Sequence, residues 1–165
     1  ESGARIALFG DGSVVDLVAT LVNRAESGRP VSLDLLGGQR HTGHLWWVGS
    51  AAVGLRAAGA ADVLVALGAV AVLRDAPGRE VPKATTAAPP APRTSRSLGS
   101  GSLIEALSSL RYDEPDVSVF GRTGGSPIAR GSLGAVGRDA FVVLEPDGHR
   151  AVVTAHSVGW VRLDP

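Results

Sequence analysis

The feature that most constrains the fold of this 165-residue chain is an internal repeat. A shift of 88 positions aligns residues 43–74 with residues 131–162 without a gap. Gly43 and Gly49 fall on glycines of the second copy, and most apolar strand positions fall on apolar residues. Matched positions include Gly43 with Gly131, Leu45 with Leu133, Val48 with Val136, Val53 with Phe141, and Arg74 with Arg162. Repeats that keep both the glycines and the apolar alternation in phase indicate duplicated structural units. We therefore predict two copies of one small unit.

The two copies are separated by a low-complexity stretch. Residues 76–101 read APGREVPKATTAAPPAPRTSRSLGSG, a segment rich in proline and alanine with almost no large apolar side chain. Such a segment buries too little apolar surface to offset the entropy cost of ordering it. The expected organisation is an N-terminal segment (1–12), a first unit (13–75), a disordered linker (76–101) and a second unit (102–165).

Each unit is expected to open with a short helix. Ser13 is followed three residues later by Asp16, and Ser102 is followed in the same way by Glu105. A serine followed three residues later by an acidic residue is typical of a capped helix start. The apolar residues behind each serine recur at helical spacing and form one stripe, which needs a sheet to cover it.

Five short strands are expected to follow each helix. Alternating apolar and polar residues predict strands at 31–35, 41–47, 51–55, 63–67 and 70–73, with counterparts at 117–119, 139–144, 151–154 and 158–163 in the second unit. Gly43 lies within the predicted strand 41–47, and because glycine has no Cβ the strand can bend sharply there. Short, strongly bent antiparallel strands avoid open edges by curling into a barrel. The predicted fold class is mainly β with short helices.

The pattern V-x-L-x-x-x-G-G-x-x-x-x-G-x-L-x-x-V-G-x-x-x-V-x-L of residues 31–55 resembles the first signature of the Sm-like fold. The second unit resembles it too and adds the typical acidic residue, Asp139, in VGRDAFVVL. The chain is also similar to uncharacterised actinobacterial proteins in which an Sm-like unit follows a helical region. This resemblance implies two Sm-like units, each an N-terminal helix plus a five-stranded, strongly bent antiparallel barrel. It also implies homo-oligomers or rings joined through exposed edge strands.

The resemblance does not extend to the RNA pocket of the Sm-like family. Sm-like RNA binders carry a polar residue such as Asn after the acidic turn and an Arg-Gly pair in the last hairpin. The corresponding stretches here, AAVGL and AFVVL, are apolar, and the last hairpins, ALGAVAVL and AHSVGWVR, lack that pair. The family's mode of gripping a base is therefore not expected.

Several classes of function are disfavoured by composition. Formal net charge is zero, so no overall excess of cations favours non-specific nucleic-acid binding, and there is no cysteine for thiolate chemistry. No apolar run reaches the roughly 18 residues that span a bilayer, and no signal peptide is evident, which predicts a cytoplasmic protein. The chain begins at Glu1 and contains no Met, which indicates a trimmed sequence.

No catalytic or metal-binding pattern stands out. His41 and His44 lie three apart in a predicted strand and are expected to point to opposite faces, which favours structural or solvated histidines over a metal pair. There is no G-x-S-x-G elbow, P-loop or H-E-x-x-H motif. We therefore expect no enzyme activity, no cofactor and no metal.

Two sets of side chains are candidate contact residues. The three tryptophans are candidates for a protein contact, because aromatic residues supply much interface energy; they are Trp46, Trp47 and Trp160. That contact could join the two units or two chains, and the alternative is that the helix or the other unit covers them. Four arginines near turns are candidates for phosphate contacts, with a solvated surface as the alternative; they are Arg40, Arg122, Arg130 and Arg138.

The sequence thus favours a non-catalytic interaction or assembly protein, with other protein chains, and homo-oligomers in particular, as partners. One alternative is an RNA- or DNA-binding regulatory protein, which strong salt-dependent oligonucleotide binding would reveal. The other is a small-ligand-binding protein, which would need a deep pocket lined by convergent polar side chains.

Overall fold

The computed structural model describes residues 5–7, 14–57, 61–77 and 101–164. Most of the predicted N-terminal segment and linker lies outside these residues. The described chain is mainly antiparallel β-sheet with two short α-helices, as the sequence predicts. No helix in the described part has the length and hydropathy needed to cross a membrane.

Each half of the chain contributes five strands to the main sheet. The first half has β3 (Val31–Leu35), β4 (Arg40–Val48), β5 (Ala52–Arg56), β6 (Asp62–Ala66) and β7 (Val70–Asp75). The second half has β8 (Asp116–Gly121), β9 (Pro127–Val136), β10 (Ala140–Leu144), β11 (Arg150–Thr154) and β12 (Val158–Asp164). Nine of these ten strands lie where the period-two patterns predicted a strand, and β9 covers the region that the repeat aligns with residues 41–47. Two shorter strands, β1 (Arg5–Ala7) and β2 (Val14–Asp16), form a separate pair.

The connectivity is the same in both halves. In each half the second, third and fourth strands follow the first as a meander, and the fifth returns to pair with the first. Short 3₁₀ turns, Leu67–Ala69 and Ala155–Ser157, precede the fifth strand in both. Corresponding backbone hydrogen bonds also recur: Leu67 N–H donates to the Ala51 carbonyl at 2.9 Å, and Ala155 N–H donates to the Asp139 carbonyl at 2.8 Å.

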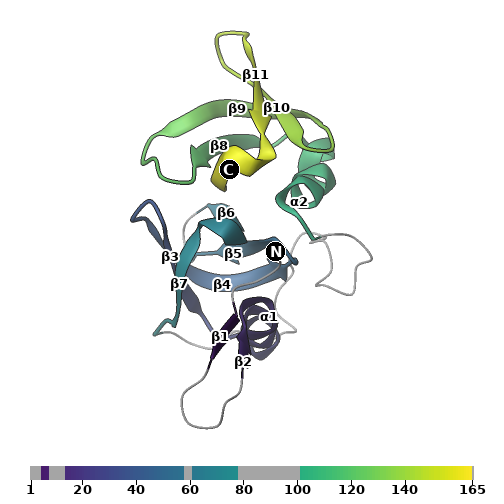
Figure 1. Ribbon diagram of the computed structural model, residues 1–165. Coiled ribbons are helices and arrows are strands. Elements are labelled where there is room, and N and C mark those ends of the chain that lie inside the picture. Colours follow the sequence, from purple (N-terminus) through teal and green to yellow (C-terminus); the bar gives the residue numbers. More distant parts are fainter. Residues whose placement is uncertain (1–4, 8–13, 58–60, 78–100, 165) are drawn as a thin grey trace.

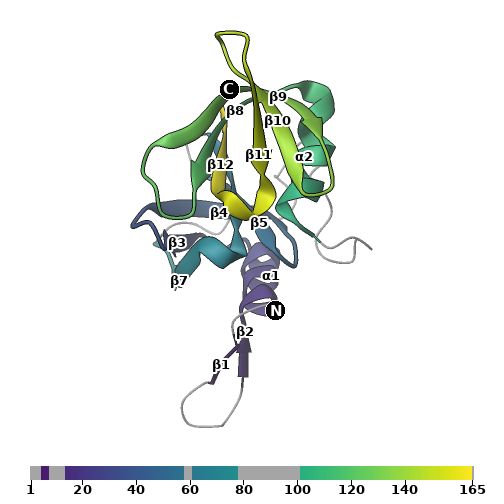
Figure 2. The ribbon, with the colours of Figure 1, turned by 45° about the horizontal axis from the view of Figure 1, so that its top comes forward.

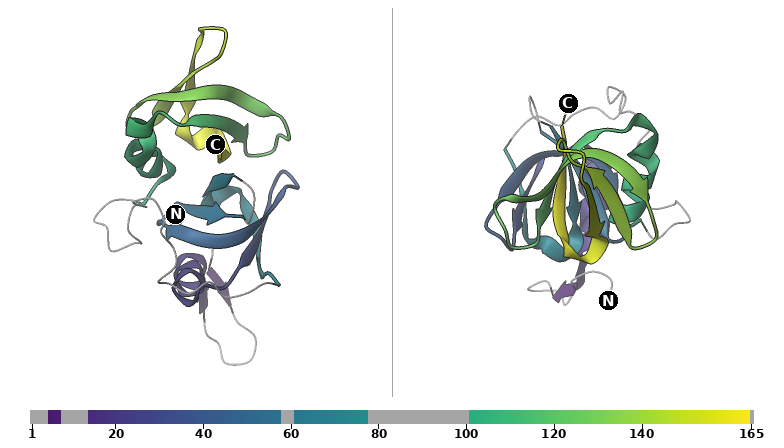
Figure 3. Two further views of the ribbon diagram at one scale, coloured as in Figure 1. Left: turned by 180° about the vertical axis from the view of Figure 1, so that it is seen from behind. Right: turned by 90° about the horizontal axis from the view of Figure 1, so that it is seen from above.

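The two halves join into one open sheet. β6 pairs with β12, so the strand order is β11-β10-β9-β8-β12-β6-β5-β4-β3-β7, with β11 and β7 at its ends. Figures 1 and 3 show the two halves stacked on each other, with β6 near the yellow β12 between them. The sequence predicted two closed barrels, whereas the structure shows one continuous open sheet. The reason is that β6 and β12 pair with each other across the halves, so neither strand is free to close a barrel within its own half.

The first helix, α1 (Leu17–Ser27), begins at a different residue from the one predicted. Asp16 is its N-cap, and Oδ1 of Asp16 accepts a hydrogen bond from Val18 N–H at 3.0 Å. The expected cap, Ser13, lies outside the described residues, and Val14–Asp16 is the strand β2. The helix ends at Gly28, whose φ of 70° suits the left-handed cap.

The second helix, α2 (Leu103–Leu110), confirms the predicted cap. Ser102 Oγ accepts from Glu105 N–H at 3.3 Å, and Glu105 Oε2 accepts from Gly101 N–H at 2.7 Å. Figures 1 and 2 show α2 beside the second half and α1 at the far end of the first half.

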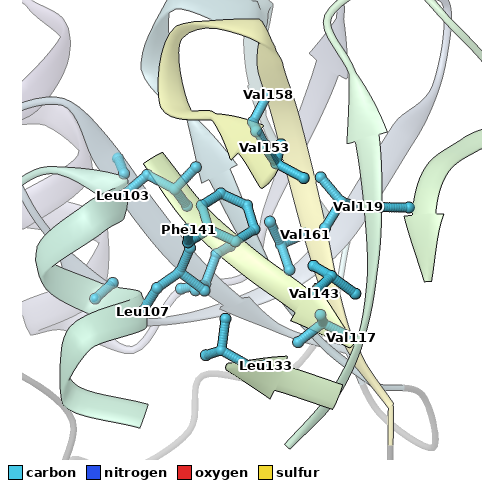
Figure 4. Close-up of a cluster of buried hydrophobic side chains, with 14 of the residues drawn as sticks. Leu103, Leu107, Val117, Val119, Leu133, Phe141, Val143, Val153, Val158 and Val161 are labelled. Carbon is cyan, nitrogen blue, oxygen red and sulfur yellow. The ribbon is translucent and has the colours of Figure 1, made fainter. Parts of the chain in front are cut away.

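The buried apolar side chains form two clusters, and each contains residues of both halves. One cluster lies mainly in the second half, around Phe141 and Leu107 (Figure 4), but it includes Trp47, Ala52 and Leu64 from the first. The other lies mainly in the first half and includes Phe120 and Trp160 from the second. Burial of apolar surface therefore holds the two halves together.

Candidate functional site

The junction between β6 and β12, which we call the seam, is the structural centre of the chain. The paired residues are Val65 with Trp160, Leu64 with Val161, Val63 with Arg162, and Asp62 with Leu163. β12 also pairs with β8 on its other side, so it is an interior strand. A central strand exchanges backbone hydrogen bonds on both edges, which fixes the two halves relative to each other.

Trp160 is buried at the seam rather than on the outer surface. Its side chain is 7% exposed and stacks on Phe120, with ring centroids 3.7 Å apart and planes 3° from parallel. His41 of the first half meets the Trp160 ring edge-on, with centroids 4.3 Å apart. Trp160 therefore packs against residues of the first half as well as its own.

The other two tryptophans lie side by side on β4 and neither is exposed. Trp47 is 1% exposed and belongs to the cluster around Phe141, whereas Trp46 is half-buried and packs against that same cluster. Adjacent strand residues were expected to face opposite ways, inward and outward. The pairing of β4 with β5 shifts register between Leu45 and Trp47, and the Trp46 ring covers Gly54, where no side chain competes for the space.

The four candidate arginines lie on different elements. Arg40, at the start of β4, binds Asp34 through Nε at 2.5 Å and Nη2 at 3.2 Å. Arg122 follows β8 and donates from Nε to the His156 carbonyl at 2.6 Å. Arg130 on β9 and Arg138 after β9 are exposed. Two of the four thus serve contacts within the chain, and two face solvent.

A pocket of about 270 Å³ lies beside the seam. Its walls come from β4, β5 and β6 of the first half and from β12 of the second. The polar and aromatic lining residues are Arg40, His41, Thr42, Trp160 and Arg162. Two buried nitrogens in this group, Nε2 of His41 and Nε1 of Trp160, have no hydrogen-bond partner among the residues that the structure describes. The sequence did not single out this group, because its members come from strands far apart along the chain.

Burial lowers the pKa of His41 below its ordinary value of 6.5. Because the unfolded chain binds this proton more readily than the folded chain, stability rises with pH. His41 therefore favours the folded state above pH 6.5, and this contribution is lost as the pH falls below 6.5 toward the lower pKa of the folded state.

We accordingly expect the free energy of unfolding to decrease between pH 7 and pH 5.5 in urea titrations. His41→Phe, which keeps a ring against Trp160, should reduce that decrease. His156→Gln, at an exposed side chain in the 3₁₀ turn before β12, is the matched control and should leave the decrease unchanged. An undiminished pH dependence in His41→Phe would contradict the assignment to His41.

A second cluster of polar groups closes the turn between β10 and β11. Ligand-type atoms of Glu145, Asp147 and His149 lie within 4.8 Å of one another. Asp147 accepts from the His149 backbone N–H at 3.0 Å and contacts His149 Nδ1 at 2.9 Å. The backbone hydrogen bond from His149, followed by the ring contact, lowers the pKa of the Asp147 carboxyl. These hydrogen bonds close the turn, which explains why the three side chains lie close together.

The two end strands of the sheet carry exposed apolar side chains. β7 carries Val72, which is 39% exposed, and β11 carries Val152, which is 69% exposed. An end strand presents unpaired backbone N–H and C=O groups that can pair with another chain. Figure 1 places β11 at the top of the second half and β7 at the left of the first half.

No family model, curated protein or solved structure matches the chain. Its function is therefore inferred from the seam, the pocket and the two end strands.

Proposed function

We propose that this chain is a non-catalytic assembly module, built from two duplicated Sm-like units, that associates with further copies of itself through β7 and β11. The observation that supports the proposal is the seam. Within the chain, the fourth strand of the first half (β6) pairs with the fifth strand of the second half (β12). The two end strands are the repeat equivalents of the seam strands. β11, the fourth strand of the second half, corresponds to β6, and β7, the fifth strand of the first half, corresponds to β12.

The repeat also predicts the register of the contact between copies. Shifting the seam pairs by 88 positions places Val72 opposite Val153, Leu73 opposite Val152, Arg74 opposite Ala151, and Asp75 opposite Arg150. The exposed valines of both edges would be covered, and the charges of Asp75 and Arg150 are opposite. Cross-strand apolar and opposite-charge pairs each contribute about 0.2–1 kcal/mol.

Such a contact joins different edges of the two copies, so it is head-to-tail. Head-to-tail contacts produce a closed ring when the rotation per copy closes, and a filament when it does not. The contact would be more polar than the seam, since Val72 on β7 and its partner Asp34 on β3 occupy the places that Trp160 and Phe120 have at the seam. Assembly should therefore be reversible and weakened by salt.

We expect the full chain to form oligomers in low salt, measured by native mass spectrometry and light scattering over a range of concentrations. Val152→Lys and Val72→Lys should each shift the population to monomer, because a charge would be buried in the new strand pair. Arg150→Asp, which places two carboxylates opposite each other, should weaken association about tenfold, a cost of about 1.4 kcal/mol.

Ile128→Lys is the matched control. Ile128 is 52% exposed but lies on β9, an interior strand, so its substitution should leave the mass distribution unchanged. A wild-type chain that stays monomeric at every concentration in low salt would refute the proposed function.

A further inference from the structure

We propose that the pocket beside the seam binds a small organic anion, with a carboxylate or phosphate held between Arg40 and Arg162 and an apolar body beside Trp160. The inference is independent of assembly through β7 and β11, because the pocket lies at the junction within one chain. It exists only where the two halves meet, with Arg40 on β4 of the first half and Arg162 on β12 of the second.

The first argument is the charge of the pocket. No aspartate or glutamate is among its lining residues. Arg40 binds Asp34 through Nε and Nη2, and Arg162 binds Asp164 through Nε at 2.7 Å and Ser118 Oγ through Nη2 at 3.2 Å. Within the described residues, Nη1 of neither guanidinium makes a hydrogen bond, so each retains donors for a ligand.

The charge around Arg40 is not fully compensated. Asp34 also forms an ion pair with Arg74, so one carboxylate is shared by two guanidinium groups. The bonds to Asp34 and Asp164 hold the two arginines in place without exhausting their donors. Guanidinium groups that are already oriented lose less freedom when they bind a carboxylate or phosphate.

The second argument is the pair of unsatisfied nitrogens. Trp160 is 7% exposed, and within the described part of the chain its Nε1–H has no acceptor and Nε2 of His41, beside it, has no partner. Buried polar groups are nearly always hydrogen-bonded, and an exception calls for a reason such as a ligand. A ligand oxygen that accepts from Trp160 Nε1 would satisfy this group.

The third argument is size and lining. At about 270 Å³ the pocket lies just below the common range of ligand sites, which excludes large cofactors and suits a single ring with one acidic group. Leu55 and Val63 supply apolar surface. Carboxylate and phosphate share the geometry that guanidinium groups recognise, so the two anion types are separated by experiment.

The test uses the full chain with benzoate and phenyl phosphate as probes, benzamide as the neutral probe of similar size, and inorganic phosphate alone. Binding is measured by calorimetry and by the three indole N–H signals in NMR spectra, with Trp160→Phe used to assign one of them. We expect at least one anionic probe to shift the Trp160 signal and to bind at least tenfold more tightly than benzamide. The relative affinities of the two anionic probes identify the preferred acidic group.

Arg40→Gln should weaken that binding about tenfold, because it removes the charge at one wall. Trp160→Phe should weaken it, because the ligand loses the indole N–H while an aromatic ring remains stacked on Phe120. The matched control is Arg138→Gln, at an exposed position outside the pocket, which should change nothing. The proposal fails if benzamide binds as tightly as the anionic probes, if Arg40→Gln has no effect, or if inorganic phosphate alone binds as tightly as both anionic probes.

Discussion

Replacing Gly131 by alanine is expected to destabilise the chain by about 3 kcal/mol or more, through the loss of the sheet in the second half. A Cβ at Gly131 would overlap the carbonyl oxygen of Leu144, and Glu145 Cα would lie 3.0 Å away. These are backbone atoms at the end of β10, so no side-chain rotation relieves the overlap. The strands β9 and β10 would have to separate at the point where β9 also pairs with β8.

The measurement is urea unfolding followed by circular dichroism, with Gly124→Ala as the control. Gly124 lies in the turn between β8 and β9, where the nearest atom to an added Cβ is 3.9 Å away, so the expected change is within about 0.5 kcal/mol. The equivalent residue of the first half, Gly43, faces the Arg56 carbonyl in the same way and should respond like Gly131. Wild-type stability in Gly131→Ala would show that this close approach of backbones is not needed.

Local patterns predicted the strands and the second helix because the information is local. Val117, Ser118 and Val119 of β8 alternate between apolar and polar, which is enough to predict a strand, although the structure buries both of its faces. The Ser102 cap needs only residues of its own turn. The local sequence did not determine the first residue of the first helix as clearly. Ser13 and Asp16 are both good cap residues, and the β-branched Val14 and Val15 between them also suit a strand, which the pairing with Arg5–Ala7 realises.

The seam and the pocket could not be predicted in the same way. The sequence pattern around Trp160 predicts a buried strand, but it does not predict which strands pair with it. Val152 illustrates the converse: Ala151, Val152 and Val153 form an apolar run typical of a buried strand, yet Val152 is 69% exposed on β11. His41 and Arg162 lie on strands far apart in sequence, so only strand pairing across the two halves brings them together.

Replacing Trp47 by alanine is expected to destabilise the chain by about 3–5 kcal/mol, the usual cost of truncating a buried aromatic side chain. Trp47 lies on β4 of the first half and is 1% exposed. Its cluster consists mostly of second-half residues, among them Leu107 and Phe141. The cavity would therefore open between the halves, and the loss of stability would affect both of them.

Hydrogen exchange of backbone amides can distinguish shared from local destabilisation. In Trp47→Ala we expect amides of β4 and of β10 to lose protection together, because a residue of one half completes the core of the other. Leu36→Ala, at a side chain 58% exposed, should leave both halves protected. Retained protection in β10 would mean that the second half folds without the first. Joint loss would mean that the seam is part of one cooperative unit, in which the geometry of the two end strands depends on both halves.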